Sequence, residues 1–212
     1  MLRVNEIYAS IQGEGTRAGR PCTLIRLAGC NLRCAWCDTK HAYDAGRPMS
    51  LAEVLAAAKE LAIGQVMVTG GEPLLQQECP ALLSALCDAG HETLLMTNGS
   101  LDISGVDERV IRCLDVKCPA SGQSGSALWP NLESLRASDE VKFVIAERGD
   151  YDFARQVIAE HRLIGRCEVI LSVAAGLLAP AALAKWMLED RLEARLGVQL
   201  HKLIWPDVQR GT

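Results

Sequence analysis

The sequence predicts a single α/β domain built on a parallel β-sheet. Six short apolar runs rich in β-branched residues alternate with segments of helical periodicity, an order typical of βαβ units. The 212 residues fit one domain, and 49% of them are hydrophobic, so a large core can form without disulfides. No internal repeat, low-complexity tract or interdomain linker is visible. The spacing suits an open sheet or one curled into a barrel.

The expected strands are short runs bounded by Gly, Pro or Asn. In chain order they are Cys22–Ala28, Gln65–Val68, Thr93–Met96, Val110–Val116, Val141–Ala146 and Glu168–Val173. Ser50 and Glu53 form a capping box that opens a helix running to about Ala62. Periodicity predicts further helices over Leu74–Ala89, Tyr151–Glu160 and Ala181–Leu196, and residues Pro119–Asn131 read as a loop.

Charge and composition narrow the class of protein. The net charge is −4 with acidic and basic residues well mixed, which argues against binding to nucleic-acid phosphates. No run approaches the roughly 18 apolar residues of a membrane span, and the N-terminus lacks a signal-peptide pattern. We therefore expect a cytoplasmic protein that binds neither nucleic acid nor membrane. Nine cysteines are an odd number, and a reducing compartment disfavours disulfides, so clustered cysteines suggest a metal site.

Unusual residues follow four of the expected strands. They are Gly29-Cys30, Thr69-Gly70-Gly71-Glu72-Pro73, Thr97-Asn98-Gly99 and Lys117. Because the carboxyl ends of parallel strands meet at one edge of the sheet, and ligand sites lie there, we expect these residues to share one site.

Three cysteines, Cys30, Cys34 and Cys37, lie close together with the spacing C-x3-C-x2-C. Three thiolates can hold a 4Fe–4S cluster and leave one iron open to a small chelating cofactor. The alternative is a zinc site in which His41 completes a Cys3His set. The cluster is favoured because all the ligands lie in one segment, and because the other strand ends carry residues suited to an organic ligand.

The cysteine motif, with Trp36 before its last cysteine, resembles the signature of the radical S-adenosylmethionine superfamily. Gly70-Gly71-Glu72-Pro73 resembles the motif of that superfamily that binds the methionine amino group of the cofactor. A narrower resemblance, to the 7-carboxy-7-deazaguanine synthase family of queuosine biosynthesis, spans nearly the whole chain. It rests on Gln12-Gly13-Glu14-Gly15, Cys37-Asp38-Thr39, Thr97-Asn98-Gly99, Asp115-Val116-Lys117-Cys118-Pro119 and His201-Lys202.

The fold implied by the resemblance is a single-domain, partial (open, truncated) β/α barrel of the radical SAM type with parallel strands. The single domain would comprise an N-terminal substrate-binding segment over 1–21, core strands and helices over 22–176 and a C-terminal helix and tail over 177–212. A homodimer is also implied by the family and not by the residues.

The implied activity is that of a carbon–nitrogen lyase. In the family, a 5′-deoxyadenosyl radical takes a hydrogen from 6-carboxy-5,6,7,8-tetrahydropterin, and ring contraction with loss of ammonia gives 7-carboxy-7-deazaguanine. The cofactors would be a 4Fe–4S cluster, S-adenosylmethionine and Mg2+, with an external electron donor such as flavodoxin or ferredoxin. No side chain is expected to be catalytic, because the cofactor carries the radical chemistry.

The resemblance assigns residues to the cofactors. Cys30, Cys34 and Cys37 would bind the cluster, and Thr39 would ligate Mg2+, an assignment that rests on resemblance alone. The residues expected to line S-adenosylmethionine are Trp36, Cys37, Asp38, Gly71, Asp115, Val116, Lys117 and Ser172. Two alternatives stay open from the residues: Trp36 as an ordinary core aromatic, and Asp115 with Lys117 as a simple salt pair.

The substrate residues implied by the family are Ile11, Gln12, Gly13, Glu14, Arg26 and Thr69. Amide and carboxylate groups can hydrogen-bond to the edge of a guanine-like ring. The planar guanidinium of Arg26 suits a carboxylate, and an arginine in an apolar strand is otherwise costly to bury. Thr69 has a plainer alternative, because threonine is common in strands.

Some features depart from the family pattern. Met96 stands where some members have an acidic residue, the segment Ser172–Gly176 differs from the usual one, and the chain continues past Pro206 to Thr212. The remaining cysteines are expected to be small buried hydrophobes: Cys22, Cys79, Cys87, Cys113, Cys118 and Cys167.

Two other functions are considered, an activase of a glycyl-radical enzyme and a non-enzymatic zinc-binding module. Gln12–Gly15 with Asp38-Thr39 favour a small ring substrate and a metal over both.

Overall fold

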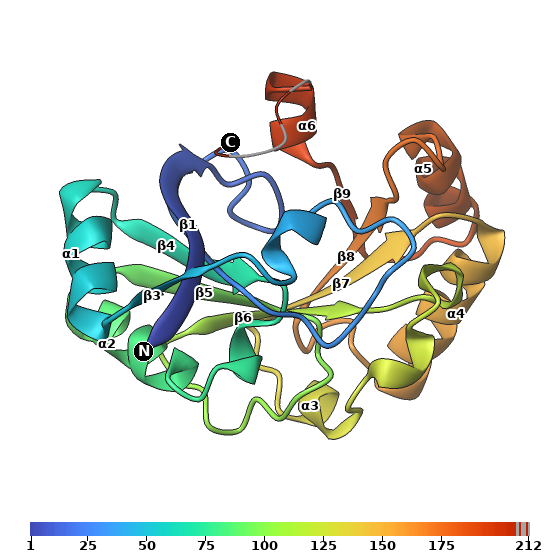
Figure 1. Ribbon diagram of the computed structural model, residues 1–212. Coiled ribbons are helices and arrows are strands. Elements are labelled where there is room, and N and C mark those ends of the chain that lie inside the picture. Colours follow the sequence, from blue (N-terminus) through green and yellow to red (C-terminus); the bar gives the residue numbers. More distant parts are fainter. Residues whose placement is uncertain (207, 209–210, 212) are drawn as a thin grey trace.

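The computed structural model describes residues 1–206, 208 and 211, and one curved sheet forms its centre (Figure 1). The strands of the described part are β1 (Leu2–Ile11), β2 (Pro21–Leu27), β3 (Arg47–Met49), β4 (Gln65–Gly70), β5 (Glu92–Thr97), β6 (Ile111–Val116), β7 (Glu140–Ile145), β8 (Glu168–Val173) and β9 (Arg195–Gly197). Their order in the sheet is β3-β1-β2-β4-β5-β6-β7-β8-β9, so the sheet is open and not closed. From β2 to β9 every neighbouring pair is parallel, whereas β1 is antiparallel to β2 and β3.

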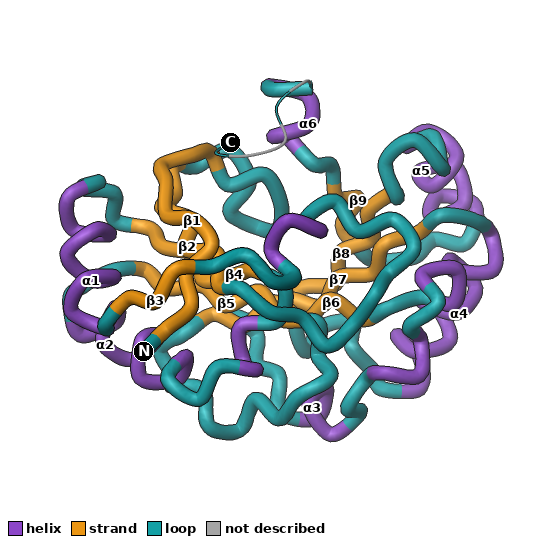
Figure 2. The backbone as a smooth tube through the Cα atoms, in the orientation of Figure 1, coloured by secondary structure: helices purple, strands orange, loops and turns teal. Residues whose placement is uncertain are grey.

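Five helices of the described part lie along the outer, convex side of the sheet. They are α1 (Leu51–Glu60), α2 (Cys79–Asp88), α3 (Pro130–Glu133), α4 (Arg148–Glu160) and α5 (Pro180–Glu189). Figure 2 shows α1 and α2 at one end of the arc and α4 and α5 at the other, with α6 (Leu200–Ile204) standing apart on the inner side. Within the described residues, no helix is long and apolar enough to span a membrane.

Strand alternation gives the two faces of the sheet different roles. The outer face buries Leu27, Val68 and Leu114 with the helices in the main core. The inner face carries a smaller apolar cluster, formed by Cys22, Met67, Leu94 and Ile111 with Leu24 and Met96 packed against it. On the same strands, nearer their carboxyl ends, the inner face turns polar at Arg26, Thr69 and Asp115.

All six predicted strands are confirmed, as β2 and β4 to β8, with no end shifted by more than two residues. Three strands are absent from the prediction. β1 occupies half of the segment predicted only as substrate-binding, and its antiparallel pairing makes the sheet mostly, not wholly, parallel. β3 and β9 are too short to show an alternating pattern.

Two helix predictions are wrong in extent. The helix predicted over Leu74–Ala89 divides into a 3₁₀ turn at Pro73–Leu75 and α2, which starts at Cys79 because Pro80 fits only the first turn of a helix. The helix predicted to reach Leu196 ends at Glu189. Arg191 has φ 50°, a left-handed conformation that stops the helix and turns the chain toward β9.

Other local predictions agree with the structure more closely. The capping box is present: Ser50 Oγ accepts from the Glu53 N–H at 3.2 Å, and Glu53 Oε2 accepts from the Ser50 N–H at 2.6 Å. α1 then ends at Glu60, slightly before the predicted Ala62. The loop predicted over Pro119–Asn131 contains two 3₁₀ turns and the start of α3.

Candidate active site

The loop after β2 holds Cys30, Cys34 and Cys37, all half-buried. Its shape is set largely by groups other than the thiols. Arg33 Nη1 donates to the Cys30 carbonyl at 2.8 Å, and the Arg33 guanidinium lies 4.2 Å from the centroid of the Tyr43 ring. The Ala35 N–H donates to the Ser121 carbonyl at 3.1 Å, which ties the loop to the segment after β6. The three sulfurs are therefore available to a ligand within a supported loop.

The position of His41 argues against the Cys3His zinc set that the sequence left open. Among the described residues, no group of three or more His, Cys, Asp or Glu side chains is placed to hold a single metal ion. His41 does not join the cysteines, because its Nε2 lies 3.3 Å from Glu6 Oε1 on β1. In a 4Fe–4S cube each cysteine binds a different iron, so its three sulfurs lie farther apart than ligands around one zinc.

Two glycines at the end of β4 let the backbone approach this loop closely. A Cβ on Gly71 would lie 2.2 Å from the Gly29 carbonyl oxygen and 2.5 Å from Cys30 Cβ. Gly70 has φ 151°, and a Cβ there would meet the Leu27 carbonyl oxygen at 2.1 Å. Only glycine fits these contacts, so the predicted cofactor residue Gly71 lies directly against the first cysteine.

Glu72 is fully buried and connects the ends of neighbouring strands. Its Oε1 accepts from the Leu74 N–H at 3.0 Å and from Thr97 Oγ1 at 2.9 Å, and its Oε2 accepts from the Asn98 N–H at 2.7 Å. Asn98 Nδ2 in turn donates to Asn31 Oδ1, inside the cysteine loop, at 3.0 Å. Burial raises the pKa of Glu72 despite these donors. The motifs quoted from the sequence thus form one hydrogen-bonded support for the cysteine loop.

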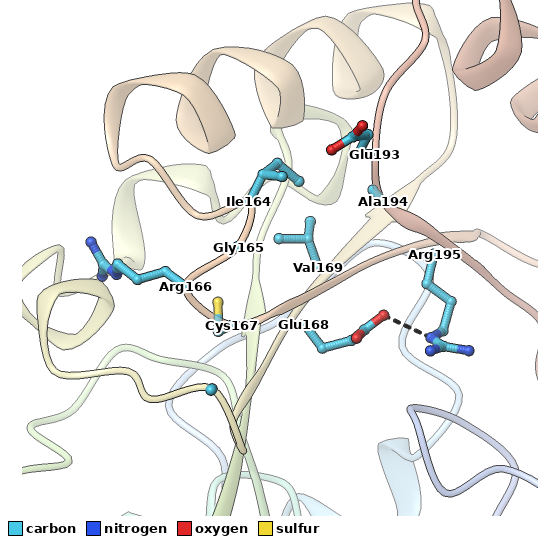
Figure 3. Close-up of a pocket in the computed structure, with 10 residues that line it drawn as sticks. Ile164, Gly165, Arg166, Cys167, Glu168, Val169, Glu193, Ala194 and Arg195 are labelled. Carbon is cyan, nitrogen blue, oxygen red and sulfur yellow. Dashed lines mark hydrogen bonds and ion pairs between the residues drawn. The ribbon is translucent and has the colours of Figure 1, made fainter.

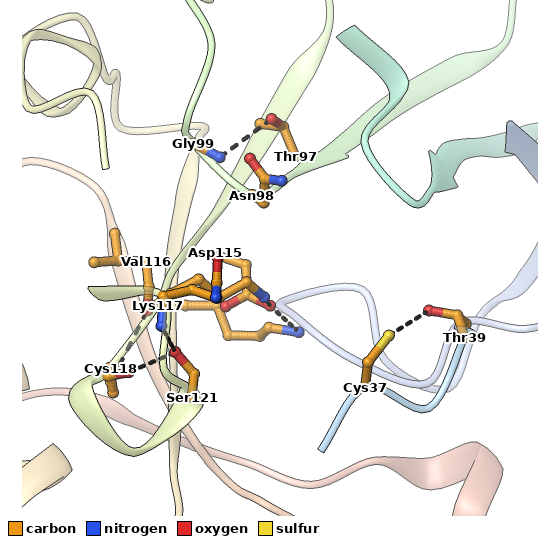
Figure 4. Close-up of polar contacts among 12 residues, drawn as sticks. Cys37, Thr39, Thr97, Asn98, Gly99, Asp115, Val116, Lys117, Cys118 and Ser121 are labelled. Carbon is orange, nitrogen blue, oxygen red and sulfur yellow. Dashed lines mark hydrogen bonds and ion pairs between the residues drawn. The ribbon is translucent and has the colours of Figure 1, made fainter. Parts of the chain in front are cut away.

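A charged cluster of Glu14, Asp115, Lys117 and Lys142 lies at the polar end of the inner face. Lys117 Nζ is 2.9 Å from Asp115 Oδ2, a pair drawn in Figure 4. Lys142 Nζ, from β7, lies 2.7 Å from Glu14 Oε2 and 3.4 Å from Asp115 Oδ2. Gln199 Nε2 donates to Glu14 Oε1 at 2.5 Å. The predicted substrate residue Glu14 and the predicted cofactor residue Asp115 are therefore joined through one lysine.

Lys142 is absent from the residues predicted from the sequence. The signal was present, because a lysine within the apolar run Val141–Ala146 is as unusual as the arginine at position 26. The salt pair considered for Asp115 and Lys117 does form.

Electrostatics keep this cluster ionised. Burial alone would raise the pKa values of Glu14 and Asp115, but the lysines outweigh it and hold both pKa values below their ordinary range. The two carboxylates likewise raise the pKa of Lys142 against the effect of burial. Asp115 Oδ1 is buried and has no hydrogen-bond partner among the described residues. Such an oxygen fits the hydroxyl or N–H group of a bound ligand.

The N-terminal segment, predicted to bind the substrate, packs against the C-terminal segment at α6. Gln12 is buried, with Nε2 3.6 Å from Met67 Sδ on the inner face. The Leu200 N–H donates to the Gly13 carbonyl at 3.0 Å, and the His201 ring packs so closely on Gly13 that a Cβ there would overlap it. Burial lowers the pKa of His201. The segment at α6 therefore covers the predicted pterin-binding residues.

Asp38 and Thr39 follow the last cysteine. Lys202 Nζ from α6 lies 3.1 Å from Asp38 Oδ2, so this predicted cofactor residue is paired with the C-terminal segment. Thr39 Oγ1 lies 3.7 Å from Cys37 Sγ, a contact visible in Figure 4. The predicted Mg2+ residue thus lies beside Cys37, a predicted cluster ligand.

Arg26 and Thr69 are adjacent on neighbouring strands, paired in register between β2 and β4. Arg26 already has protein partners: its Nε donates to Glu6 Oε1 at 2.6 Å and its Nη2 to the Tyr8 hydroxyl at 3.2 Å. Glu6 and Tyr8 come from β1, the strand missed in the sequence. The Arg26 guanidinium is therefore held by two side chains of β1, and Arg26 lies beside Thr69 near the carboxyl ends of β2 and β4.

The other predicted residues are placed as follows. Ile11 ends β1, Val116 ends β6 in the core, and Trp36 is half-buried in the cysteine loop. Ser172 is buried in β8 against Gly197 of the edge strand β9. Five of the six remaining cysteines are buried as expected, and Cys87 is only half-buried. The part of the tail at residues 207, 209, 210 and 212 lies outside the described residues.

A surface cavity of about 480 Å³ lies away from this site (Figure 3). It is lined at the amino-terminal ends of β8 and β9 by residues such as Cys167, Val169 and Ala194, with the Arg195–Glu168 pair at 2.8 Å beside them. None of the predicted site residues lines it. The predicted site residues lie instead at the opposite edge of the sheet, where the parallel strands have their carboxyl ends.

Comparisons with known proteins agree with this site. Residues 24–119 match the model of the Radical SAM superfamily. The crystal structure of QueE from Escherichia coli has the same fold, with a TM-score of 0.76 at 21% identity over 93% of each chain. The fold and the site together define a radical S-adenosylmethionine enzyme.

Curated relatives identify the family. A 7-carboxy-7-deazaguanine synthase from Koribacter versatilis is 42% identical over 99% of this chain and 100% of its own length. A second, from Chlorobaculum tepidum, is 43% identical over 99% of this chain and 97% of its own. The chain belongs to the 7-carboxy-7-deazaguanine synthase family. It is thus a lyase of queuosine biosynthesis that uses a 4Fe–4S cluster, S-adenosylmethionine and Mg2+. The activase and zinc-module alternatives are not favoured.

Proposed function

We propose that the residues at the carboxyl edge of the sheet act together to convert 6-carboxy-5,6,7,8-tetrahydropterin into 7-carboxy-7-deazaguanine and ammonia. The observation that carries this proposal is the charged cluster, because it connects Glu14 in the pterin segment to Asp115 in the cofactor segment. A substrate on one side and a cofactor on the other would then face each other across the inner face of the sheet.

The cofactor side is formed by the cysteine loop and three strand ends. Cys30, Cys34 and Cys37 hold the 4Fe–4S cluster, which with S-adenosylmethionine supplies the 5′-deoxyadenosyl radical. Gly71 lets the end of β4 approach the cysteine loop closely, which brings this strand end beside the proposed cluster. The open oxygen of Asp115 accepts from the cofactor, and Lys117 keeps that carboxylate ionised. Trp36, Asp38, Val116 and Ser172 complete the lining.

The substrate side is formed by the segment 11–14 with Arg26 and Thr69. Glu14 is held as a carboxylate, so it can accept from the N–H groups of the pterin ring. Gln12 and the backbone of Gly13 contribute further polar groups to the same ring. Arg26, held from behind by Glu6, presents its planar fork to the substrate carboxylate. Thr69 contacts the substrate beside it.

Thr39 would hold the magnesium ion, a hard cation that prefers oxygen ligands. The enzyme works in the cytoplasm as a homodimer of single-domain subunits and takes electrons from flavodoxin or ferredoxin. All of these assignments rest on the family. The magnesium assignment is also supported by the position of Thr39 beside Cys37.

The test is anaerobic turnover of the reconstituted enzyme with S-adenosylmethionine, Mg2+, dithionite and the carboxytetrahydropterin. We expect 7-carboxy-7-deazaguanine and 5′-deoxyadenosine, both detected by mass spectrometry. Formation of 5′-deoxyadenosine without the deazaguanine would refute the substrate assignment and leave the superfamily assignment intact. Omitting Mg2+ in a parallel reaction tests the Thr39 site, and a Thr39→Ala variant should reproduce the effect.

A further inference from the structure

Lys142 lies at the centre of the charged cluster and belongs to none of the predicted binding segments. It sits in β7, and its side chain is only 6% exposed. Its Nζ contacts Glu14, from the β1–β2 loop, at 2.7 Å and Asp115, from β6, at 3.4 Å. One buried cation therefore contacts both sides of the site.

The charges of the cluster balance only with Lys142 present. Glu14 and Asp115 contribute two carboxylates, and Lys117 and Lys142 contribute two ammonium groups. All four side chains are largely shielded from solvent, with exposures of 6% to 19%. Removing Lys142 would leave two buried carboxylates with Lys117 alone, which contacts Asp115, and such an arrangement favours protonation of one carboxylate.

Glu14 is the carboxylate that would respond most. Lys142 contacts its Oε2, and the uncharged Gln199 donates to its Oε1, so Lys142 is the cation in direct contact with it. The titratable groups that face Glu14 or its lysine from the packed elements are Asp115 and Cys113 of β6, Lys117, His201 of α6, and Asp38, which is itself paired with Lys202. Lys117 lies against Asp115 and does not replace Lys142 at Glu14.

We propose that Lys142 is a positioning residue that keeps Glu14 ionised and oriented toward the N–H groups of the pterin. By contacting Asp115 as well, it fixes the substrate side of the site relative to the cofactor side. The proposal rests on the proposed function of Glu14 and Asp115. It predicts that Lys142 acts on the substrate through Glu14 and leaves the cluster and its cysteines unaffected.

The first experiment measures binding without turnover. The affinity of the product, 7-carboxy-7-deazaguanine, is determined by isothermal titration calorimetry over a range of pH with wild type, Lys142→Met, Lys142→Arg and Glu14→Gln. Lys142→Met should bind at least ~10-fold more weakly at neutral pH. The pH below which binding weakens should rise by about one pH unit or more, because Glu14 then takes up a proton more readily. Lys142→Arg, which keeps the charge, should restore much of the affinity.

The second experiment is a double-mutant cycle with Glu14→Gln. If Lys142 acts through Glu14, Lys142→Met should cause little further loss of affinity when Glu14 is already neutral. Lys185→Met, on the exposed face of α5, is the matched control and should bind the product like wild type. Iron and sulfide content after anaerobic reconstitution should match wild type in Lys142→Met, because the ion pairs of Lys142 are with Glu14 and Asp115.

The outcomes separate this proposal from the proposed function. If wild type fails to bind the product, the substrate assignment itself is wrong. If wild type binds and Lys142→Met binds equally well at every pH, the role of Lys142 is refuted. Lys142→Met alone could fail to fold, judged by circular dichroism. In that case the product affinity of the double variant Glu14→Gln, Lys142→Met is compared with that of Glu14→Gln alone. Equal affinity then supports the proposal, and a further loss overturns it.

Discussion

The backbone N–H of Asn98 donates to Glu72 Oε2 at 2.7 Å, so one buried carboxylate joins the ends of β4 and β5. The side chain of Asn98 then contacts Asn31 in the cysteine loop. Through these contacts the ends of β4 and β5 support the cysteine loop. The cluster that we propose for this loop would need such support, because metal-ligand positions must be closely fixed.

Gly71→Ala should disrupt this support at one point. The added methyl group would overlap the Gly29 carbonyl and Cys30 Cβ, so the cysteine loop or the end of β4 must shift. A displacement of this size is expected to reduce product formation by about 100-fold. Iron content and S-adenosylmethionine binding should fall with it. Gly64→Ala is the matched control, because nothing lies within 4 Å of a Cβ at that position. Equal losses in both variants would contradict the close-contact argument.

Cys34→Ala should abolish the cluster, and with it all cleavage of S-adenosylmethionine. The measurements are iron and sulfide content after anaerobic reconstitution and 5′-deoxyadenosine formation. Cys87→Ala, at a half-buried cysteine on α2, should keep both properties. Zinc in place of iron, or retained cleavage in Cys34→Ala, would show that the cysteine assignment is wrong.

Arg26→Lys should weaken recognition of the substrate carboxylate. Lysine keeps the charge but lacks the planar fork that binds both carboxylate oxygens and Glu6 together. We expect KM for the carboxytetrahydropterin to rise about 10-fold or more. Glu6→Gln, which loosens the same guanidinium from behind, should have a smaller effect in the same direction. Binding of a tetrahydropterin without the carboxylate serves as the control and should change little in Arg26→Lys.

The parallel part of the fold could be predicted from the sequence because its signals are local. Buried parallel strands are apolar on both faces, and residues such as Val66–Val68 show this directly. β1 could not be recognised in the same way. Its residues are mostly half-exposed, and Glu6 and Tyr8 point toward partners that the sequence does not reveal. β9 exists because the edge of β8 offers backbone partners, which is a property of the folded sheet.

The site residues also fall into two groups, those signalled locally in the sequence and those that come together only in the folded protein. Cys30, Cys34 and Cys37 could be proposed as metal ligands because their spacing within one loop suggests that role, and Gly71 is assigned to the cofactor through its family motif. Lys142 could not be placed, because its partners Glu14 and Asp115 are far from it in the sequence and meet only on the inner face. The pairing of Asp38 with Lys202 has the same origin, since α6 folds back over the N-terminal segment.

Asp139→Asn should destabilise the fold without touching the site. Asp139 is fully buried and accepts hydrogen bonds from the main chains and guanidinium groups of Arg112 and Arg136. Replacing the carboxylate would leave Arg112, itself buried, without its counter-charge, so the free energy of unfolding should fall by about 3 kcal/mol at neutral pH. Glu60→Gln, an exposed change on α1, should shift it by no more than about 0.5 kcal/mol.

The pH dependence of that loss identifies the carboxylate as its cause. Burial alone would raise the pKa of Asp139, but the hydrogen bonds from Arg136 and Arg112 outweigh it and lower the pKa. A carboxyl group whose pKa is lowered by folding stabilises the protein above its unfolded pKa, about 3.9, and loses that effect as pH falls through the folded value. Urea unfolding should therefore show a constant difference between wild type and Asp139→Asn from pH ~7 to ~5, and a shrinking one below pH ~4. A difference that stays constant at the lower pH would mean that packing, and not the charge on Asp139, accounts for the loss.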